Sequence, residues 1–262
     1  MTQFWDTQIH RADELAAEPG GARDLLVFYS QLLRAQKQVY QQLRSRHDWL
    51  PTADLPKDFA AIQEAISGVF ETVALHGPSE LATQAQGLLN ADAGNVAEKL
   101  CAHWQKPTDI DFFPKAILQP YAHWLRERGA RPFGRQLPGD ERTCPFCGGR
   151  PQVSFLQSKE STAESGNRDL ICSTCLHSWE FRRIVCAYCG EERPAQLSYF
   201  HSARFDHIRI EACDTCKRYL KGIDLTRVGL AAPLVDEIYA VPLDLWAVEH
   251  GYTKIELNLV GV

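Results

Sequence analysis

The sequence lacks any long hydrophobic run. Hydrophobic residues make up 45% of its 262 positions, but no apolar stretch approaches the roughly 18 residues that indicate a membrane-spanning helix. The N-terminal twenty residues are polar and acidic, without the basic segment, apolar segment and cleavage site of a secretory signal. We therefore expect a cytoplasmic protein with no membrane partner.

The sequence also lacks the short motifs that mark several common enzyme classes. It has no Gly-x-Ser-x-Gly elbow, no phosphate-binding Walker loop, no dinucleotide fingerprint after a predicted strand and no zinc-protease helix motif. Adjacent polar pairs such as His47-Asp48 and Asp236-Glu237 are expected to be ordinary surface residues. We therefore predict that the protein is not an enzyme.

Cysteine, in contrast, is plentiful and unevenly distributed. Eight of the nine cysteines fall between Cys144 and Cys216, all in Cys-x-x-Cys pairs, whereas Cys101 stands alone. Cys101 is expected to be a buried small side chain on a helix. In a reducing compartment, paired cysteines indicate metal ligands or redox dithiols before structural disulfides. The cysteines thus divide the chain into unlike parts.

Residues 1–135 are predicted to form an α-helical domain. Apolar side chains recur there at steps of three and four, the period of one helix face, and Gly77-Pro78 is a common helix stop. The candidate helices cover residues 23–46, 59–73, 79–89, 95–105 and 113–127. Five or six helices with short connections predict a bundle, with Trp104 and Trp124 in its core.

The rest of the chain is predicted to contain further units, which makes the fold class multi-domain α+β. The stretch from Arg131 to Arg142 is rich in Pro, Gly and charge and is expected to be a linker. After it, short β-prone runs such as 153–156 and 207–210 lie between glycines and cysteines. The predicted units are a first rubredoxin-like or zinc-ribbon module at 136–184, a second at 185–224 and a C-terminal segment at 225–262, with short helices near 233–240 and 242–250 and an extended run at 255–259.

The cysteine region is a duplication in spacing. The two cysteines of the first pair recur 42 residues later, and those of the second pair recur 41 residues later. Gly148 and Gly190 follow the first pair of each half, and glycine readily adopts the positive φ that such turns often need. Two residues between cysteines let both thiolates reach one ion at about 2.3 Å. We therefore predict two tandem metal sites, the first ion held by Cys144, Cys147, Cys172 and Cys175 and the second by Cys186, Cys189, Cys213 and Cys216.

Each half of this repeat spans about 40 residues, which is too few for a self-sufficient hydrophobic core. Its ion is therefore expected to supply much of the folding free energy, which for structural zinc in small fingers is roughly 10–16 kcal/mol. A closed four-sulfur shell leaves no position for water or substrate, so we expect structural or electron-transfer sites. Zinc and iron both accept this shell, and the spacing does not separate them.

Three other interpretations of the pairs stay open on the residues alone. A Cys-x-x-Cys pair can be a redox dithiol, although that needs a βαβ context. The pairs could form disulfides in an exported protein, which the missing signal argues against. First pairs could share one ion and second pairs the other, although the tandem repeat favours sequential sites. With four cysteines for each ion, the nearby His177, His201 and His207 are expected to be exposed polar residues rather than ligands.

The charge balance argues against nucleic acid as the partner of these predicted ribbons. Residues 144–224 contain eleven Lys and Arg against ten Asp and Glu, whereas a phosphate-binding surface needs a basic excess. A local patch of Lys217, Arg218 and Lys221 is the best basic cluster available. We therefore expect no nucleic-acid partner, while an electron-transfer module stays an alternative.

Four segments around the cysteine pairs carry a family resemblance. They are Cys144-Pro145-Phe146-Cys147-Gly148-Gly149-Arg150-Pro151, Leu170-Ile171-Cys172-Ser173-Thr174-Cys175, Val185-Cys186-Ala187-Tyr188-Cys189-Gly190 and Glu211-Ala212-Cys213-Asp214-Thr215-Cys216-Lys217-Arg218-Tyr219-Leu220-Lys221. This order resembles the bacterial formate dehydrogenase accessory, or formation, proteins. The likeness extends over nearly the whole chain, including the closing Asp244-Leu245-Trp246-Ala247 helix. The four-pair order is its most specific part.

The resemblance implies a cytoplasmic maturation factor needed for formate dehydrogenase activity. It implies two rubredoxin-like iron sites, so iron is favoured over zinc on this ground. It also implies contact with the molybdenum- and iron–sulfur-containing catalytic subunit, through a metal-folded docking surface, before that subunit is exported by the twin-arginine route. The alternatives are a rubredoxin-like electron-transfer protein and a nucleic-acid-binding zinc ribbon.

Overall fold

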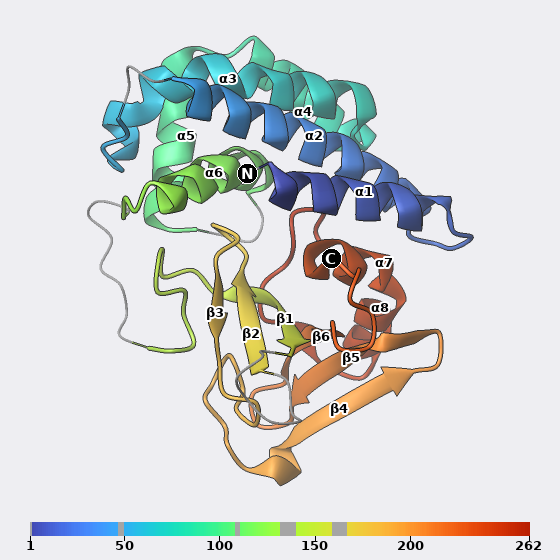
Figure 1. The fold of residues 1–262 in the computed structure, drawn as a ribbon. Coiled ribbons are helices and arrows are strands. Elements are labelled where there is room, and N and C mark those ends of the chain that lie inside the picture. Colours follow the sequence, from blue (N-terminus) through green and yellow to red (C-terminus); the bar gives the residue numbers. More distant parts are fainter. Residues whose placement is uncertain (1, 47–49, 108–110, 132–139, 159–166) are drawn as a thin grey trace.

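The computed structural model describes residues 2–46, 50–107, 111–131, 140–158 and 167–262. It has a helical layer formed by the N-terminal half and a sheet layer formed by the cysteine region, with two C-terminal helices beside the sheet (Figure 1). His47-Asp48 and most of the predicted linker lie outside the described residues. The helical region followed by a cysteine-containing sheet confirms the predicted α+β class.

The helical layer contains six helices among the described residues. They are α1 Gln3–Ala17, α2 Arg23–Ser45, α3 Leu55–His76, α4 Ser79–Leu89, α5 Ala93–Gln105 and α6 Phe112–Glu127. Five of them were predicted, whereas α1 was not among the candidate helices. Its buried face includes Gln8 and Arg11, and these polar residues interrupt the apolar stripe that reveals an amphipathic helix.

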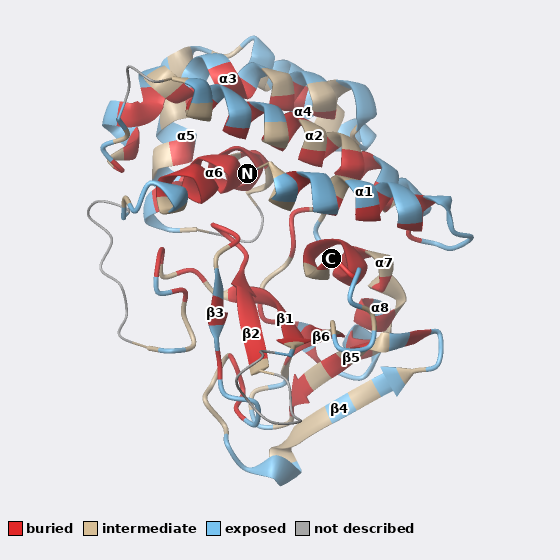
Figure 2. Cartoon of the chain, viewed as in Figure 1, coloured by how far each residue is buried: buried red, intermediate tan, exposed pale blue. Residues whose placement is uncertain are grey.

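Helix α6 lies on the side of the helical layer that faces the sheet, and most of its residues are buried (Figure 2). Pro120 within it has no N–H, so the carbonyl of Ala116 has no helical donor. The side chain of Gln36 on α2 donates to that carbonyl at 2.7 Å. The missing helical hydrogen bond is therefore replaced by one that joins α2 to α6.

Among the described residues, the strands of the cysteine region and β7 of the C-terminal segment form one seven-stranded sheet of order β3-β2-β1-β6-β5-β4, with β7 pairing β6. The strands are β1 Pro151–Gln157, β2 Asn167–Cys172, β3 Ser178–Glu180, β4 Leu197–Ser202, β5 Phe205–Cys213, β6 Arg218–Asp224 and β7 Thr253–Lys254, and a short 3-10 helix η1 covers Pro194–Gln196. The two halves of the repeat join where β1 and β6 pair in parallel. The predicted module boundaries stay a prediction, because the sheet runs through both halves.

The C-terminal segment contains helices α7 Pro233–Tyr239 and α8 Val241–Glu249, close to the predicted positions. The predicted extended run at 255–259 is wrong, because the last strand is β7 and turns follow it. The side chain of Asn258 causes this, since its Oδ1 accepts hydrogen bonds from the N–H groups of Val260 and Val262. Such a local side-chain bond favours a turn over a strand.

Helix α7 lies between the helical layer and the sheet, which overturns one expectation. Asp236 and Glu237 were expected at the surface, but both are fully buried. Asp236 accepts from Arg11 of α1 at 2.7 Å and lies 2.9 Å from His207 Nε2 of β5. Glu237 pairs with Lys254 of β7 at 2.8 Å. Charged residues can be buried in this way when each has a partner.

Within the described ranges, none of the helices combines the length and the apolar character needed to cross a membrane.

Candidate metal centre

The structure brings the eight paired cysteines together in two groups of four. The first cage consists of Cys144, Cys147, Cys172 and Cys175, and the second cage consists of Cys186, Cys189, Cys213 and Cys216. Within each cage all sulfur atoms lie within 4.8 Å of one another. The grouping is sequential, so each half of the repeat builds its own cage rather than sharing ligands with the other half.

The sulfur–sulfur distances fit a tetrahedral metal ion. The shortest are 3.5 Å in the first cage and 3.7 Å in the second. A tetrahedron of sulfurs about 2.3 Å from its centre has edges of about 3.8 Å. A disulfide would need about 2.0 Å. The donor set in each cage therefore suits a closed thiolate shell of the kind that zinc or iron accepts.

Each cysteine pair lies on a turn of the same shape. Gly148 and Gly190 have φ values of 72° and 79°, which confirms the expected use of glycine there. Leu176 and Lys217 occupy the equivalent place after the second pair of each half, with φ values of 57° and 56°. In all four turns this residue's N–H donates to the carbonyl of the pair's first cysteine at 2.8–3.2 Å.

Sequence reasoning missed Leu176 and Lys217 as turn residues. A non-glycine residue in this conformation costs roughly 1–2 kcal/mol, and neither Leu nor Lys signals positive φ. Their equivalent place in the repeat, directly after the second cysteine of a pair, is the signal that would have found them. The surrounding structure holds Leu176 and Lys217 in this strained conformation because it closes the turn that directs two cysteine sulfurs at one ion.

Backbone amides point at the sulfurs from inside these turns. The N–H of Thr174 lies 3.4 Å from Cys172 Sγ, and the N–H of Tyr188 lies 3.4 Å from Cys186 Sγ. Such contacts stabilise a ligating thiolate. Burial raises the pKa of Cys186 to about 11, so an ion that binds there must displace a proton.

Tyr188 connects the two cages. It lies inside the first turn of the second cage, and its ring faces two guanidinium groups. Arg150, three residues after Cys147, lies 4.5 Å from the ring centroid, and Arg218, two residues after Cys216, lies 5.0 Å from it. Cation–π contacts of this kind join the first turn of the first cage to both turns of the second.

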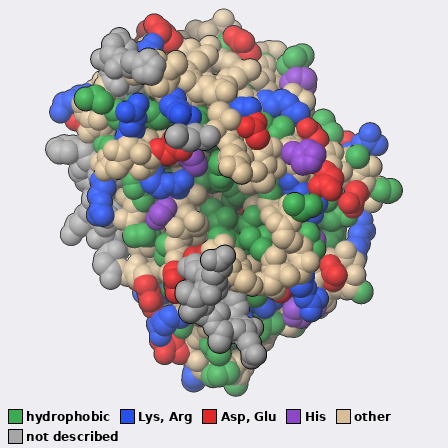
Figure 3. Space-filling view, viewed as in Figure 1, with side chains coloured by type: hydrophobic (Ala, Val, Ile, Leu, Met, Phe, Trp, Pro, Cys, Tyr) green, Lys and Arg blue, Asp and Glu red, His purple; other side chains and the backbone are tan. Residues whose placement is uncertain are grey.

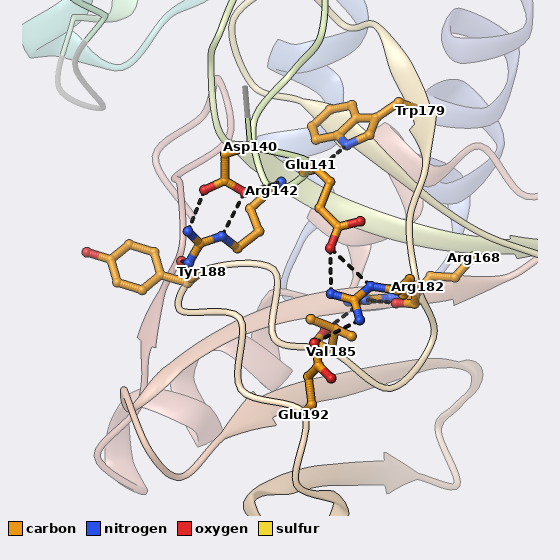
Figure 4. Close-up of polar contacts among 9 residues, drawn as sticks. All are labelled: Asp140, Glu141, Arg142, Arg168, Trp179, Arg182, Val185, Tyr188 and Glu192. Atoms are coloured by element: carbon orange, nitrogen blue, oxygen red, sulfur yellow. Dashed lines mark hydrogen bonds and ion pairs between the residues drawn. The ribbon is translucent and has the colours of Figure 1, made fainter. Parts of the chain in front are cut away.

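The segment before the first cage is tied to both halves of the repeat (Figure 4). Arg142 donates to the carbonyl of Tyr188 at 3.1 Å. Glu141 accepts from Arg182 at 2.6 Å, and its carbonyl accepts from the indole N–H of Trp179 at 2.9 Å.

A buried ion pair joins β2 of the first half of the repeat to β5 of the second half. Arg168 of β2 contacts Glu211 of β5 at 2.6 Å and donates to the carbonyl of Val185, next to Cys186, at 3.2 Å. Burial alone would raise the pKa of Glu211, but Arg168 and Arg209 outweigh it and lower the pKa to about 2. The pair therefore stays charged at neutral pH.

The other candidate residues have mixed outcomes. His201 is exposed as expected, whereas His177 is half-buried and His207 pairs with Asp236, so the expectation of three exposed histidines is wrong. Cys101 is partly exposed and packs against the core rather than inside it. Trp104 and Trp124 are buried in the core as predicted.

The basic patch considered for nucleic acid does not form. Lys221 is fully buried and pairs with Asp244 and with the carbonyl of Glu237. On the face shown in Figure 3, basic and acidic side chains are interspersed rather than segregated.

Two family models match consecutive parts of the cysteine region. The central domain of FdhE matches residues 143–183, and the C-terminal domain of FdhE matches residues 184–260. A protein of Aquifex aeolicus named as an FdhE homologue is 31% identical over 207 residues, which cover 78% of this chain and 71% of that protein. The chain belongs to the FdhE family. The resemblance to formate dehydrogenase accessory proteins is thus confirmed, and FdhE membership gives the chain an accessory role for that enzyme.

Other members of the FdhE family agree with this. An FdhE homologue of Pseudomonas aeruginosa is 32% identical over 158 residues, which cover 58% of this chain and 49% of that protein. The chain therefore spans about half the length of that relative in the alignment. The crystal structure of an FdhE protein from Pseudomonas aeruginosa matches with a TM-score of 0.70 at 22% identity, covering 100% of this chain and 97% of that one. At this identity the likeness concerns the fold.

Proposed function

We propose that this chain is a cytoplasmic maturation factor that binds the catalytic subunit of formate dehydrogenase before that subunit is exported. The binding surface depends on two ions, one in each cage. The single observation that carries this proposal is the placement of both cages within one sheet, which α7 joins to the helical layer. An ion in either cage therefore shapes a surface that involves both layers.

The cages would hold their ions as closed shells. Cys144, Cys147, Cys172 and Cys175 would hold the first ion, and Cys186, Cys189, Cys213 and Cys216 the second. When bound, such an ion supplies a rigid crosslink and, if it is iron, a one-electron couple. A shell of four protein ligands leaves no position for substrate, which supports a non-catalytic role.

Iron is the proposed metal on the strength of the family resemblance, and zinc is the alternative. A visible absorption spectrum separates them, because a ferric tetrathiolate site absorbs in the visible range and a zinc site does not. Metal analysis of the same sample gives the number of ions. Two ions for each chain support the proposal.

Capture from cell extract tests whether the chain binds the catalytic subunit of formate dehydrogenase. The tagged full chain should retain the formate dehydrogenase catalytic subunit, and the Cys186→Ser, Cys189→Ser double variant should not. Cys101→Ser is the matched control, because Cys101 lies outside both cages. The double variant should also abolish formate dehydrogenase activity in cells. Equal capture by all three proteins would contradict a metal-dependent docking surface.

An electron-transfer role is the second candidate. The observation that favours it is that Cys189 and Cys216 are partly exposed, so an ion in the second cage would lie near solvent. Replacing iron by zinc discriminates the two roles. Retained formate dehydrogenase maturation with zinc supports the structural role, and lost maturation with intact folding supports the redox role.

A further inference from the structure

The two cages differ in how far their sulfurs are shielded from solvent. In the first cage no cysteine is more than 1% exposed. In the second cage Cys186 and Cys213 are buried, whereas Cys189 and Cys216 are partly exposed. The partly exposed pair includes one cysteine from each of the two turns, so solvent reaches a ligand on both turns of the second cage.

The first cage is covered by groups that are themselves buried. The side chain of Gln119 on α6 donates to the carbonyl of Ser173 at 2.9 Å, inside the turn that carries Cys172. Gln119 in turn accepts from Gln36 of α2 at 3.0 Å. The backbone of Gly149 is so close that an added Cβ would lie 2.8 Å from Cys172 Sγ. An external ligand would have to displace packed core groups to reach this cage.

The second cage is covered on its open side by short surface contacts. Thr215, between the two cysteines of the last pair, donates to Glu191 at 2.7 Å, and Lys217 contacts Asp214 at 2.6 Å. Thr215 and Lys217 are exposed. Contacts of this kind contribute little to stability. The neighbouring strand β4 is the last strand on its side of the described sheet.

We propose that the second cage is an exchange site for a soft metal ion and that the first cage is a permanent one. Cys189 and Cys216 would be the sulfurs that give way first when an incoming thiolate or aminocarboxylate competes for the second ion. Each released cysteine sulfur would remain a thiolate or take a proton from solvent, with no electron transferred. The chain would then stay in a one-ion form, with the other ion held by the first cage.

The one-ion form would keep the buried half of the sheet folded. Cys172 of the first cage is the last residue of strand β2, which pairs with β1, whereas the turn 186–190 carries two cysteines of the second cage and precedes strand β4. The docking surface would then respond to the supply of metal through the second cage. This inference rests on the proposed binding of ions, but not on the identity of the client.

Competition with a chelator tests the proposal on the full chain loaded with two zinc ions. Native mass spectrometry should show one zinc ion leaving to EDTA at least about tenfold faster than the other. N-ethylmaleimide added at the one-ion stage should label the cysteines of the second cage and spare those of the first. Equal loss rates, or labelling of the first cage before the second, would overturn the proposal.

Two variants sharpen this experiment. Gln119→Ala should speed loss of the slow ion by about tenfold without changing the fast one, because it removes a support of the first cage alone. Thr215→Ala is the matched control at the second cage. It removes only an exposed contact, so it should change the rate of loss of either ion by much less than tenfold. Cys101→Ser removes background labelling. Absence of any bound metal ion, iron or zinc, from the purified, reduced protein would instead contradict the proposed function, so the two failures are distinguishable.

Discussion

The guanidinium of Arg11 contacts the carboxylate of Asp236 at 2.7 Å across 225 positions of sequence. Both side chains are largely buried, and the contact joins α1 to α7. Because His207 of β5 reaches the same carboxylate, Asp236 connects the helical layer, α7 and the sheet. The buried charges at the boundary between the helical layer and the sheet therefore have partners, and these contacts hold the two layers together.

Removing one partner of the Arg11–Asp236 pair should destabilise the folded protein. Asp236→Ala would leave Arg11 buried without its charge partner, and we expect the free energy of unfolding to fall by about 3–5 kcal/mol. Urea denaturation of the metal-loaded protein measures it. The paired change Arg11→Met with Asp236→Leu should cost less than Asp236→Ala alone. A larger cost for the paired change would contradict this account of the interface.

His207 should make stability depend on pH. Its hydrogen bond to Asp236 raises the pKa of His207 above its usual value, against the opposing effect of burial. Protonated His207 therefore stabilises the folded state below the unfolded pKa of about 6.5, and this stabilisation is lost as pH rises through the raised folded pKa. The urea midpoint should fall over that interval. His207→Gln should remove this fall, and an unchanged profile would refute the assignment.

The turns around the cages should be sensitive to side chains. Gly190 has a φ of 79°, and an added Cβ would meet nothing nearer than 3.5 Å. Gly190→Ala should therefore cost about 1 kcal/mol through backbone strain alone. Gly87→Ala in the exposed part of α4 is the control and should stabilise by up to about 1 kcal/mol. Thermal unfolding of the two variants should shift in opposite directions.

Tyr188 should matter through its ring and not its hydroxyl. Tyr188→Ala removes the contacts to Arg150 and Arg218 and should cost about 1–2 kcal/mol. Tyr188→Phe keeps the ring between the two guanidinium groups and should cost much less. Denaturant unfolding with both cages filled compares them. Equal losses for the two variants would show that the cation–π contacts do not connect the cages.

The local features of this protein could be predicted from its sequence. The turns around the cysteine pairs need only a few neighbouring residues, so their spacing and Gly148 and Gly190 were enough to indicate four-cysteine clusters. Helices with an unbroken apolar stripe, such as α2 and α3, were found for the same reason. Helix α1 was missed because its buried face contains Arg11, whose partner is 225 positions away.

Several of the errors share one physical cause, which is long-range pairing of charges. Asp236, Glu237 and Lys221 were expected at the surface because isolated charges are rarely buried. In the structure each has a charged partner from a distant element. The parallel pairing of β1 with β6 was equally hidden, since it joins strands separated by two intervening hairpins. No local pattern reports such contacts.

Removal of the metal is the most direct test of the central claim that two ions shape the sheet. We expect two ions for each chain in the purified, reduced protein. After chelation, limited proteolysis should cut within residues 144–216, and circular dichroism should show that the helical signal is largely retained. A protein that is metal-free as purified and yet resists proteolysis throughout this region would contradict the account.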